Sequence, residues 1–235
     1  AVIAGDGDLF VAGGVESMTR APLVTAKPDA PYARGNRTIY DTTLGWRFTN
    51  PRYEERFSSA SMGETGENVA ERWAVSREEQ DGYAAESHRK AAHATSEGWF
   101  KDEILPIDIP QRKGDAIVVD TDEPIREDTT AAALSKLKPA FKKDGSVTAG
   151  NAPGVNDAAA AVVIMAAEKS RALGLTPMAR VVGQATSGLA PKLVMMTPVE
   201  AVRKVATKVG WDLKDVDLFE INEAFSVQAV AVTRE

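Results

Sequence analysis

Residues Asp217 to Phe225 combine an apolar segment with a short polar motif that could take part in catalysis. The apolar residues predict a strand over 216–221, and Asn-Glu-Ala-Phe at 222–225 leads into a second apolar stretch, which predicts a helix. An asparagine at the carboxyl end of a strand lies where ligands bind in α/β proteins. Its amide could orient a water molecule or stabilise an oxyanion. The same position is also typical of a helix N-cap, so both interpretations of Asn222 stay open.

Two further segments have the composition of a ligand site. Residues 148–157 contain two glycines and several small side chains, which would let a ligand approach the backbone closely. A tight turn before the next strand explains the same composition equally well. Residues 135–143 contain four lysines and no acidic residue, in a chain whose net charge is -6. Such a patch suits a phosphorylated ligand, and a solvated surface is the alternative explanation.

No segment combines a nucleophile with its base. The chain has no cysteine, which excludes disulfides, thiolate metal sites and a cysteine nucleophile within these residues. Its only histidines are His88 and His93, so we expect no bound metal and no cofactor of the histidine-ligated type. We interpret His88, on the inner stripe of a predicted helix, as a hydrogen-bonded structural residue. The residues alone therefore predict a crevice without naming a reaction.

Size and charge narrow the class of protein. The 235 residues, 43% hydrophobic and 26% charged, are ordinary for a globular protein of one large or two small domains. The net charge of -6 argues against nucleic acid or an anionic membrane as a partner. The longest apolar run, Ala158 to Ala167, is ten residues, about half the length of a membrane helix. No secretory signal is present at the start, so we expect a cytoplasmic protein.

The elements that position these residues follow from local signals. Ser76 to Glu79 form a capping box, which predicts a helix that ends near Gly98. Thr197, with Pro198 after it, predicts the N-cap of a second helix that ends at Gly210. Apolar runs predict strands over 158–165, 179–183 and 216–221, the first of them covered on both faces. Because strands and helices alternate, we expect parallel pairing and an α/β core.

Residues 25–60 are irregular and rich in proline, glycine and aromatic residues. This composition predicts a folded loop that contacts a ligand or another subunit. A loop whose aromatic side chains merely hold it to its own domain is the alternative.

Several motifs, in order along the chain, resemble the thiolase family, and within it the acetyl-CoA acetyltransferases. The matching segments cover almost the whole chain: 11–22, 62–70, 76–81, 87–91, 137–157 and 217–225. The resemblance implies a layered α-β-α-β-α core with an inserted loop domain, truncated at both ends. On that pattern residues 1–24 and 156–175 belong to the first thiolase half, 25–155 to the loop domain with its CoA-binding and oligomer contacts, and 176–235 to the start of the second half.

The resemblance implies an acyltransferase that condenses two acetyl-CoA molecules to acetoacetyl-CoA, or thiolyses a 3-ketoacyl-CoA. One cysteine takes the acyl group and a second moves the proton at the α-carbon. A histidine of a Gly-His-Pro segment and a water held by the asparagine of Asn-Glu-Ala-Phe stabilise the enolate oxygen. Coenzyme A is then a substrate and no other cofactor is needed. Family members form homo-oligomers, so we expect a dimer or tetramer.

The resemblance assigns roles to eight residues of this chain. Asn222 matches the catalytic, water-holding asparagine. The positions that match substrate contacts are Met62, Ala224 and Phe225 around the acyl group, Phe141, Ala149 and Ala152 along the pantetheine, and Arg126 near the adenine. Three positions depart from the pattern: Ser61 replaces a common histidine, Pro153 a common serine, and 193–198 differ from Met-Gly-x-Gly-Pro. The last two leave acyl-chain preference open.

Both catalytic cysteines and the Gly-His-Pro segment are missing from these residues. We therefore expect an internal fragment of a thiolase, inactive by itself. Two other hypotheses stay open: a non-catalytic relative that binds acyl-CoA or lipid, and an assembly role in which the aromatic loop at 32–57 is the contact.

Overall fold

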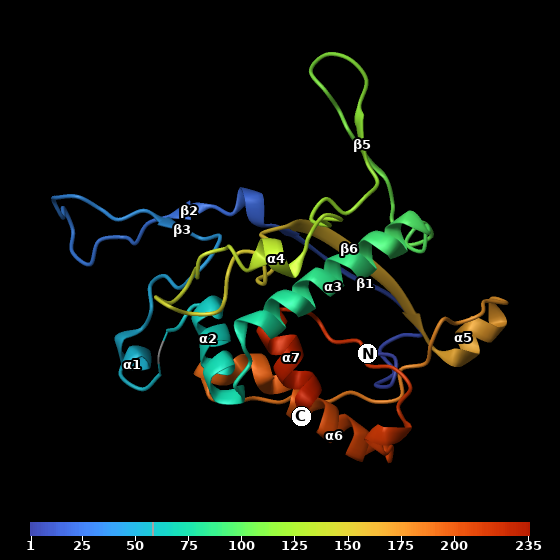
Figure 1. Ribbon diagram of the computed structural model, residues 1–235. Helices are drawn as coiled ribbons and strands as arrows, with labels where there is room; N and C mark the ends of the chain where they lie inside the picture. The colour runs from blue at the N-terminus through green and yellow to red at the C-terminus, as the bar shows by residue number, and fades with distance from the viewer. Residues whose placement is uncertain (58) are drawn as a thin grey trace. The chain divides into compact units, whose positions relative to one another are not determined.

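The computed structural model describes residues 1–57 and 59–235. Figure 1 labels most of its helices and strands. The elements are β1 (Leu9–Ser17), η1 (Met18–Arg20), β2 (Leu23–Val24), β3 (Tyr40–Asp41), α1 (Pro51–Glu54), α2 (Met62–Trp73), α3 (Arg77–Ser96), β4 (Ile107–Ile109), β5 (Ile117–Val119), α4 (Ala131–Leu134), β6 (Asp157–Met165), α5 (Ala167–Ala172), η2 (Pro191–Met196), α6 (Thr197–Val209), η3 (Leu213–Asp215) and α7 (Ser226–Arg234).

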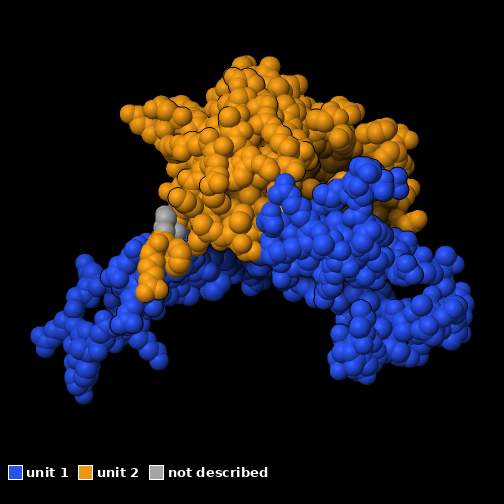
Figure 2. Space-filling view, turned by 90° about the horizontal axis from the view of Figure 1, so that it is seen from below, with its two compact units in different colours: residues 1–55, 155–187, 200–218 blue, residues 56–154, 188–199, 219–235 orange. Residues whose placement is uncertain are grey.

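The chain divides into two compact units, coloured separately in Figure 2. Unit 1 comprises residues 1–55, 155–187 and 200–218, and unit 2 comprises residues 56–154, 188–199 and 219–235. These groups follow contacts within the chain rather than the borders of a fold family. The division expected from the sequence, at residues 24, 155 and 175, stays a prediction.

Unit 1 is built on the pairing of β1 with β6. The two nine-residue strands run antiparallel, from Leu9 opposite Met165 to Ser17 opposite Asp157. At the end of this ladder the carboxylate of Asp157 accepts hydrogen bonds from the Thr19 amide at 2.9 Å and from its hydroxyl at 2.5 Å. These bonds attach the chain that follows β1 to the first residue of β6.

Three expectations about the strands are wrong: their parallel pairing, two of their positions, and the burial of the first on both faces. All three strand pairs in the described residues are antiparallel, and the predicted strands at 179–183 and 216–221 do not form, because neither segment has a partner with which to build a hydrogen-bonded ladder. The expected strand at 158–165 does form, within β6. Its faces are open rather than covered, since Val162 and Val163 are 58% and 59% exposed. An apolar run reports a preference for burial, and nothing in the described residues covers this one.

Unit 2 contains the packed core. Helices α2 and α7 and the turn η2 enclose the buried side chains of Val69, Val147, Met195, Met196, Phe225, Val227 and Ala231, among others. Helix α3 packs on α7, and α4 packs on α3. The β4–β5 hairpin belongs to the same unit and extends away from these helices in Figure 1.

The helices of unit 2 begin and end on local signals. The predicted capping box at Ser76 is confirmed, with Ser76 and Glu79 exchanging hydrogen bonds at 2.8 and 3.2 Å, and Gly98 follows the helix with φ +74°. A second capping box joins Ser61 to Glu64 at the start of α2. The N-cap expected at Thr197 is wrong. Thr197 is already helical, because η2 runs directly into α6, and its hydroxyl donates to the Val194 carbonyl at 2.8 Å.

Candidate functional site

The Asn-Glu-Ala-Phe motif lies on an irregular segment that leads into α7. Phe225 is buried and occupies the N-cap position of α7 without a side-chain cap bond, and the helix begins at Ser226. Asn222 is therefore three residues before the cap, and the N-cap interpretation of its amide is wrong. Its side chain is exposed, and the structure gives it no hydrogen-bond partner within 1–57 and 59–235. The amide of Asn222 is thus available to a ligand or a water molecule.

The next residue of the motif is held by α3. The carboxylate of Glu223 accepts one hydrogen bond from the Tyr83 hydroxyl, at 2.8 Å, and another from the Ser87 hydroxyl, at 2.6 Å. Tyr83 and Ser87 are four residues apart and so lie on one face of the helix. Burial raises the pKa of the Tyr83 hydroxyl above its ordinary value, and the hydrogen bond to Glu223 raises it further. Tyr83 therefore stays a donor throughout the physiological range of pH.

A second loop, residues 146–152, is organised by a buried carboxylate of α2. Glu67 is only 4% exposed and accepts hydrogen bonds from the amide of Ser146, at 2.9 and 3.0 Å, and from that of Val147, at 2.8 Å. The Ser146 hydroxyl also donates to it, at 3.2 Å. A carboxylate in a packed interior needs such donors to offset the loss of water. The loop is consequently fixed to α2 at its start.

Asn151 fixes the other end of this loop. Its side-chain oxygen accepts from the Thr148 amide at 2.8 Å, and its side-chain nitrogen donates to Asp81 at 3.0 Å. Asp81, on α3, also accepts a hydrogen bond from Arg77 at 2.7 Å. Between these fixed points Ala149 is exposed and Ala152 is half-buried. The loop thus presents the two alanines, which the sequence matched to pantetheine contacts, on a rigid support.

The two segments that carry candidate residues meet in unit 2. The Ser226 amide donates to the carbonyl of Asn151 at 3.1 Å, so the start of α7 is joined to the end of the loop. Ala152 and Ala224 both pack against the core cluster that contains Phe225. Four of the predicted site residues, Ala149, Ala152, Ala224 and Phe225, therefore belong to one neighbourhood, and Asn222 extends from its edge.

Phe141 and Met62 join this neighbourhood through the start of α2. The rings of Phe141 and Phe225 meet edge to face, with centroids 6.3 Å apart. Gly63 lies against the ring of Phe141 so closely that an added Cβ would be 2.2 Å from it. Only glycine permits that approach. Met62 precedes Gly63 as the first residue of α2, with about half of its surface exposed.

Arg126 is the predicted contact that the structure does not bring to this group. Its backbone amide donates to Nδ1 of His88 at 3.2 Å, on α3, and its side chain is exposed. This bond confirms His88 as a hydrogen-bonded structural histidine. In the lysine segment, Lys142 pairs with Glu71 of α2, and the hydrogen bond that its ammonium donates to Glu71 raises the pKa of Lys142. One of the four lysines is thus already engaged.

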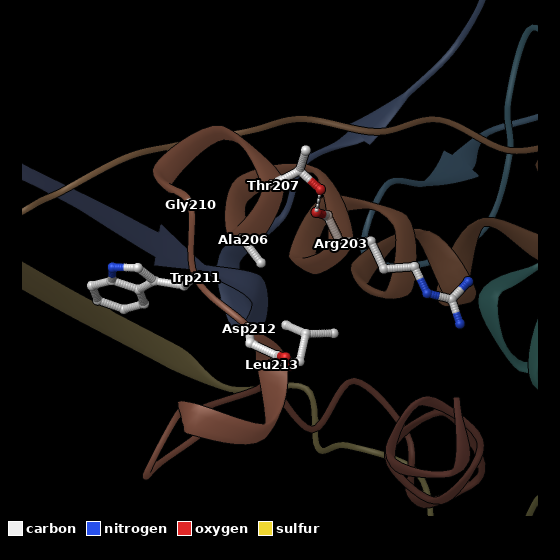
Figure 3. A pocket seen from close by; sticks show the side chains of 7 residues that line it. All are labelled: Arg203, Ala206, Thr207, Gly210, Trp211, Asp212 and Leu213. Carbon is white, nitrogen blue, oxygen red and sulfur yellow. Dashed lines mark hydrogen bonds between the residues drawn. The ribbon is translucent and has the colours of Figure 1, made fainter.

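A separate hollow of about 480 Å³ lies in unit 1, where α6 ends and the chain turns into η3. Figure 3 shows its lining: Arg203, Ala206, Thr207, Gly210, Trp211, Asp212 and Leu213. The Asp212 carboxylate accepts hydrogen bonds from the ammonium of Lys214, at 2.8 Å, and from its backbone amide, at 3.2 Å. These bonds hold the pKa of Asp212 below its usual value. None of the residues predicted from the sequence lines this hollow, and it contains no base paired with a nucleophile.

Two findings concern metals and membranes. No group of three or more histidine, cysteine, aspartate or glutamate side chains is arranged to hold a metal ion within residues 1–57 and 59–235. In the same residues, no helix has both the length and the apolar character that crossing a bilayer requires.

Comparison with known sequences decides the family. A sequence model of the thiolase N-terminal domain matches residues 1–168, and one of the thiolase C-terminal domain matches residues 175–235. The chain belongs to the thiolase family. It is 48% identical to the β-ketoadipyl-CoA thiolase of Pseudomonas putida and 45% identical to the acetyl-CoA acetyltransferase of Chromobacterium violaceum, over 235 residues in each case. These matches cover all of this chain but 58% and 59% of the two relatives.

Solved structures agree with the sequence comparison. The acetyl-CoA acetyltransferase of Bacillus anthracis superposes with a TM-score of 0.88 at 42% identity, over 99% of this chain and 57% of that one. That of Syntrophomonas wolfei gives the same TM-score at 37% identity, over 98% of this chain and 56% of that one. The predicted thiolase-like α/β fold is therefore confirmed. This thiolase chain spans just under three fifths of the length of the relatives it matches.

Sequence reasoning missed the side chains that support the thiolase motif. Glu67, Asp81 and Asn151 are buried polar residues, and each has a partner 70 or more positions away in the sequence. Tyr83 and Ser87 occur at helical spacing with Ala84 and Ala91 of the same helix. Polar side chains on an otherwise apolar stripe were the available signal, because a buried polar group requires a partner.

Proposed function

We propose that this chain is the central part of a thiolase-type acyltransferase, which condenses two acetyl-CoA molecules or thiolyses a 3-ketoacyl-CoA. The observation that carries the proposal is the exposed amide of Asn222, without a partner in the described residues, on a segment anchored by Glu223 and Phe225. A preorganised donor of this kind can stabilise negative charge that develops on a substrate oxygen. Family membership and the 42–48% identities support the same conclusion.

In this proposal the amide of Asn222 donates a hydrogen bond to a water molecule. That water donates in turn to the thioester oxygen of the acyl-CoA while the α-carbon loses its proton and the oxygen becomes an enolate. Three catalytic groups come from sequence outside these 235 residues, which contain no cysteine. They are the cysteine whose thiolate takes up the acyl group, the second cysteine and the histidine. This chain by itself is then unable to turn over substrate.

The substrate-binding roles are proposed on the same basis. Phe141, Ala149 and Ala152 lie along the pantetheine, while Met62, Ala224 and Phe225 line the acyl pocket. The ring pair of Phe141 and Phe225 and the rigid 146–152 loop support this grouping. Arg126 is assigned to the adenine end of CoA, which its exposed side chain could reach. Coenzyme A is the substrate, and no metal or other cofactor is required.

The acyl group is the finer question. Relatives named β-ketoadipyl-CoA thiolase and acetyl-CoA acetyltransferase match this chain at 48% and 45% identity, so the names alone do not choose between them. The segment 193–198, which differs from the family pattern, contributes to the core rather than to an open pocket, since Met195 and Met196 are buried against α2 and α7. We propose that the chain's reaction includes transfer of an acetyl group, a step that would be common to a β-ketoadipyl-CoA thiolase and an acetyl-CoA acetyltransferase.

The remaining features complete the proposal. The whole protein is expected to be a cytoplasmic homo-oligomer, a dimer or tetramer, built on the first-half, loop-domain and second-half division at residues 24, 155 and 175. The aromatic loop supplies exposed apolar side chains for such contacts, including Tyr32, Trp46 and Phe48.

The test uses the product of the complete gene, with acetoacetyl-CoA or 3-ketoadipyl-CoA as substrate and free CoA as the second substrate. Loss of the 3-ketoacyl-CoA is expected from the complete protein and not from residues 1–235 alone. Asn222→Ala should slow condensation by about 100-fold or more, the effect of removing an oxyanion donor, while acetylation of the cysteine, followed by mass spectrometry, continues. Gln184→Ala, which removes an exposed amide side chain in unit 1, is the control.

Three outcomes would overturn parts of the proposal. Turnover by residues 1–235 alone contradicts the need for an external thiol. Equal loss of acetylation and condensation in Asn222→Ala contradicts the water-holding role. A complete protein that binds acetyl-CoA without consuming any 3-ketoacyl-CoA favours the alternative of a non-catalytic acyl-CoA-binding relative.

A further inference from the structure

Two hydroxyl groups on α3 converge on one carboxylate of the Asn-Glu-Ala-Phe segment. Tyr83 donates to Oε1 of Glu223 at 2.8 Å and Ser87 donates to Oε2 at 2.6 Å, so each carboxylate oxygen receives one hydrogen bond. The partners are 140 and 136 positions apart in sequence. We call these three side chains the Glu223 clamp. Hydrogen bonds to both oxygens fix the rotation of the carboxylate as well as its position.

The clamp adjoins the exposed end of an otherwise anchored segment. Two residues after Glu223, Phe225 is buried in the core, and the Ser226 amide is bonded to the loop at Asn151. The Ala224 amide donates to the Asn222 carbonyl at 2.9 Å, which fixes the turn between them. Asn222 itself contributes no side-chain bond within the described residues. Its orientation is consequently set by the backbone that Glu223 and its neighbours hold.

The support for the clamp is itself rigid. Tyr83 and Ser87 lie in the middle of α3, whose first turn is closed by the Ser76 capping box. Near the start of the helix, Asp81 is buried and is hydrogen-bonded to Arg77 and Asn151. Ala84, the residue after Tyr83, is also buried. Helix α3 also packs along α7. A donor pair on such a helix has little freedom to follow Glu223, so it imposes a position on the motif rather than adapting to it.

We propose that Tyr83 and Ser87 are positioning residues for the transferase reaction, acting through Glu223 to hold the backbone that presents the Asn222 amide. This inference rests on the proposed function of Asn222. Neither hydroxyl needs to touch substrate, since both are directed at the carboxylate. Displacement of a catalytic group by about 1 Å can slow a reaction by about 100-fold, so loss of the clamp should act on turnover rather than on CoA binding.

The experiment uses the complete protein with Tyr83→Phe, Ser87→Ala, Ser87→Thr and the double variant Tyr83→Phe/Ser87→Ala. We expect each single loss of a hydroxyl to lower kcat for condensation by about tenfold and the double variant by about 100-fold. KM for CoA should be unchanged, and Ser87→Thr, which keeps the hydroxyl, should retain most of the activity. Ser96→Ala is the matched control, since Ser96 is an exposed serine at the end of the same helix.

A merely structural role is distinguished by combining each variant with Asn222→Ala. If the clamp acts through Asn222, Tyr83→Phe should have no further effect on condensation in that background. An equal loss of kcat with and without Asn222, or a double variant with unchanged kcat, overturns the inference.

Failure of the proposed function has a different signature, because the unmodified complete protein would then show no turnover at all. In that case hydrogen exchange over residues 219–226 still tests whether the clamp holds the segment. Exchange should be about tenfold faster in the double variant, in line with the loss of hydrogen bonds to a charged group. Unchanged exchange overturns the clamp itself.

Discussion

Replacement of Glu67 by glutamine tests whether a buried carboxylate holds the 146–152 loop. The change preserves the size of the side chain and removes its charge. In the structure every group that faces the carboxylate is a donor: the amides of Ser146 and Val147 and the hydroxyl of Ser146. Oε1 accepts from both amides, at 2.9 and 2.8 Å, so a glutamine oxygen in that place keeps both bonds. The NH₂ group then takes the place of Oε2, to which the Ser146 amide and hydroxyl donate at 3.0 and 3.2 Å, and the hydroxyl loses its acceptor.

The size of the effect follows from that mismatch. A hydrogen bond to a charged group contributes about 1.5–3 kcal/mol, and an unsatisfied buried donor costs about 1–3 kcal/mol. Glu67 is only 4% exposed, so water does little to compensate. We therefore expect the free energy of local opening of the loop to fall by about 2–3 kcal/mol. That change corresponds to exchange of the loop amides about 30- to 150-fold faster.

Hydrogen exchange followed by mass spectrometry on a peptide that covers residues 142–152 measures this opening directly. Glu71→Gln is the matched control, because Glu71 is one turn along the same helix and is 64% exposed. Its pairing with Lys142 is on the surface, where ion pairs contribute little. Comparable exchange in the two variants, or no acceleration in Glu67→Gln, would refute the reasoning.

Two further predictions concern other parts of the chain. Gly63→Ala should force the ring of Phe141, which is 37% exposed, away from α2. KM for CoA in the complete protein should then rise about fivefold, equivalent to the loss of about 1 kcal/mol of aromatic contact. Gly82→Ala is the control, because an added Cβ there meets nothing within 4 Å. It should leave KM for CoA unchanged and raise the free energy of unfolding by about 1 kcal/mol, since alanine has the higher helix propensity. Equal KM values in the two variants would count against a role of Phe141 in CoA binding. The Thr19 hydroxyl and amide hold the pKa of Asp157 below its usual value, so its contribution to stability is present above about pH 4 and is lost as the pH falls through the lowered pKa. The difference in melting temperature between the natural protein and Asp157→Asn should therefore shrink from pH 6 to pH 3, and a constant difference would exclude this role.

The parts of the fold that the sequence predicted are those whose interactions are local. The capping box at Ser76 and the glycine at Gly98 act within four residues of the helix end, so their residue types define the boundaries of α3. A strand depends on a neighbour that is distant in sequence. The segments 179–183 and 216–221 have suitable composition but no ladder partner in the described residues, and they remain irregular. The 183–186 backbone instead contacts α6, where Lys204 and Lys208 donate to its carbonyls.

The candidate site shows the same division. Phe141 and Phe225 were matched by motif, and the structure places their rings in contact. The pairing that fixes the motif was not predictable, since Glu223 is 136 or more positions from its donors and an exposed glutamate gives no sign of a partner in the sequence. Motifs report the groups that face a ligand, whereas the supporting bonds follow from how distant elements pack.

The two anchors of the Asn-Glu-Ala-Phe segment differ in what they can specify. Burial of Phe225 is favourable but non-directional, so it fixes the location of the chain and tolerates rotation about it. The bonds from Tyr83 and Ser87 to Glu223 are directional, and they constrain the orientation of the backbone beside Asn222. An amide that must direct one donor at a water molecule needs orientation as much as location. Because the apolar anchor supplies only location, the polar one accounts for the precision that the proposed role of Asn222 requires.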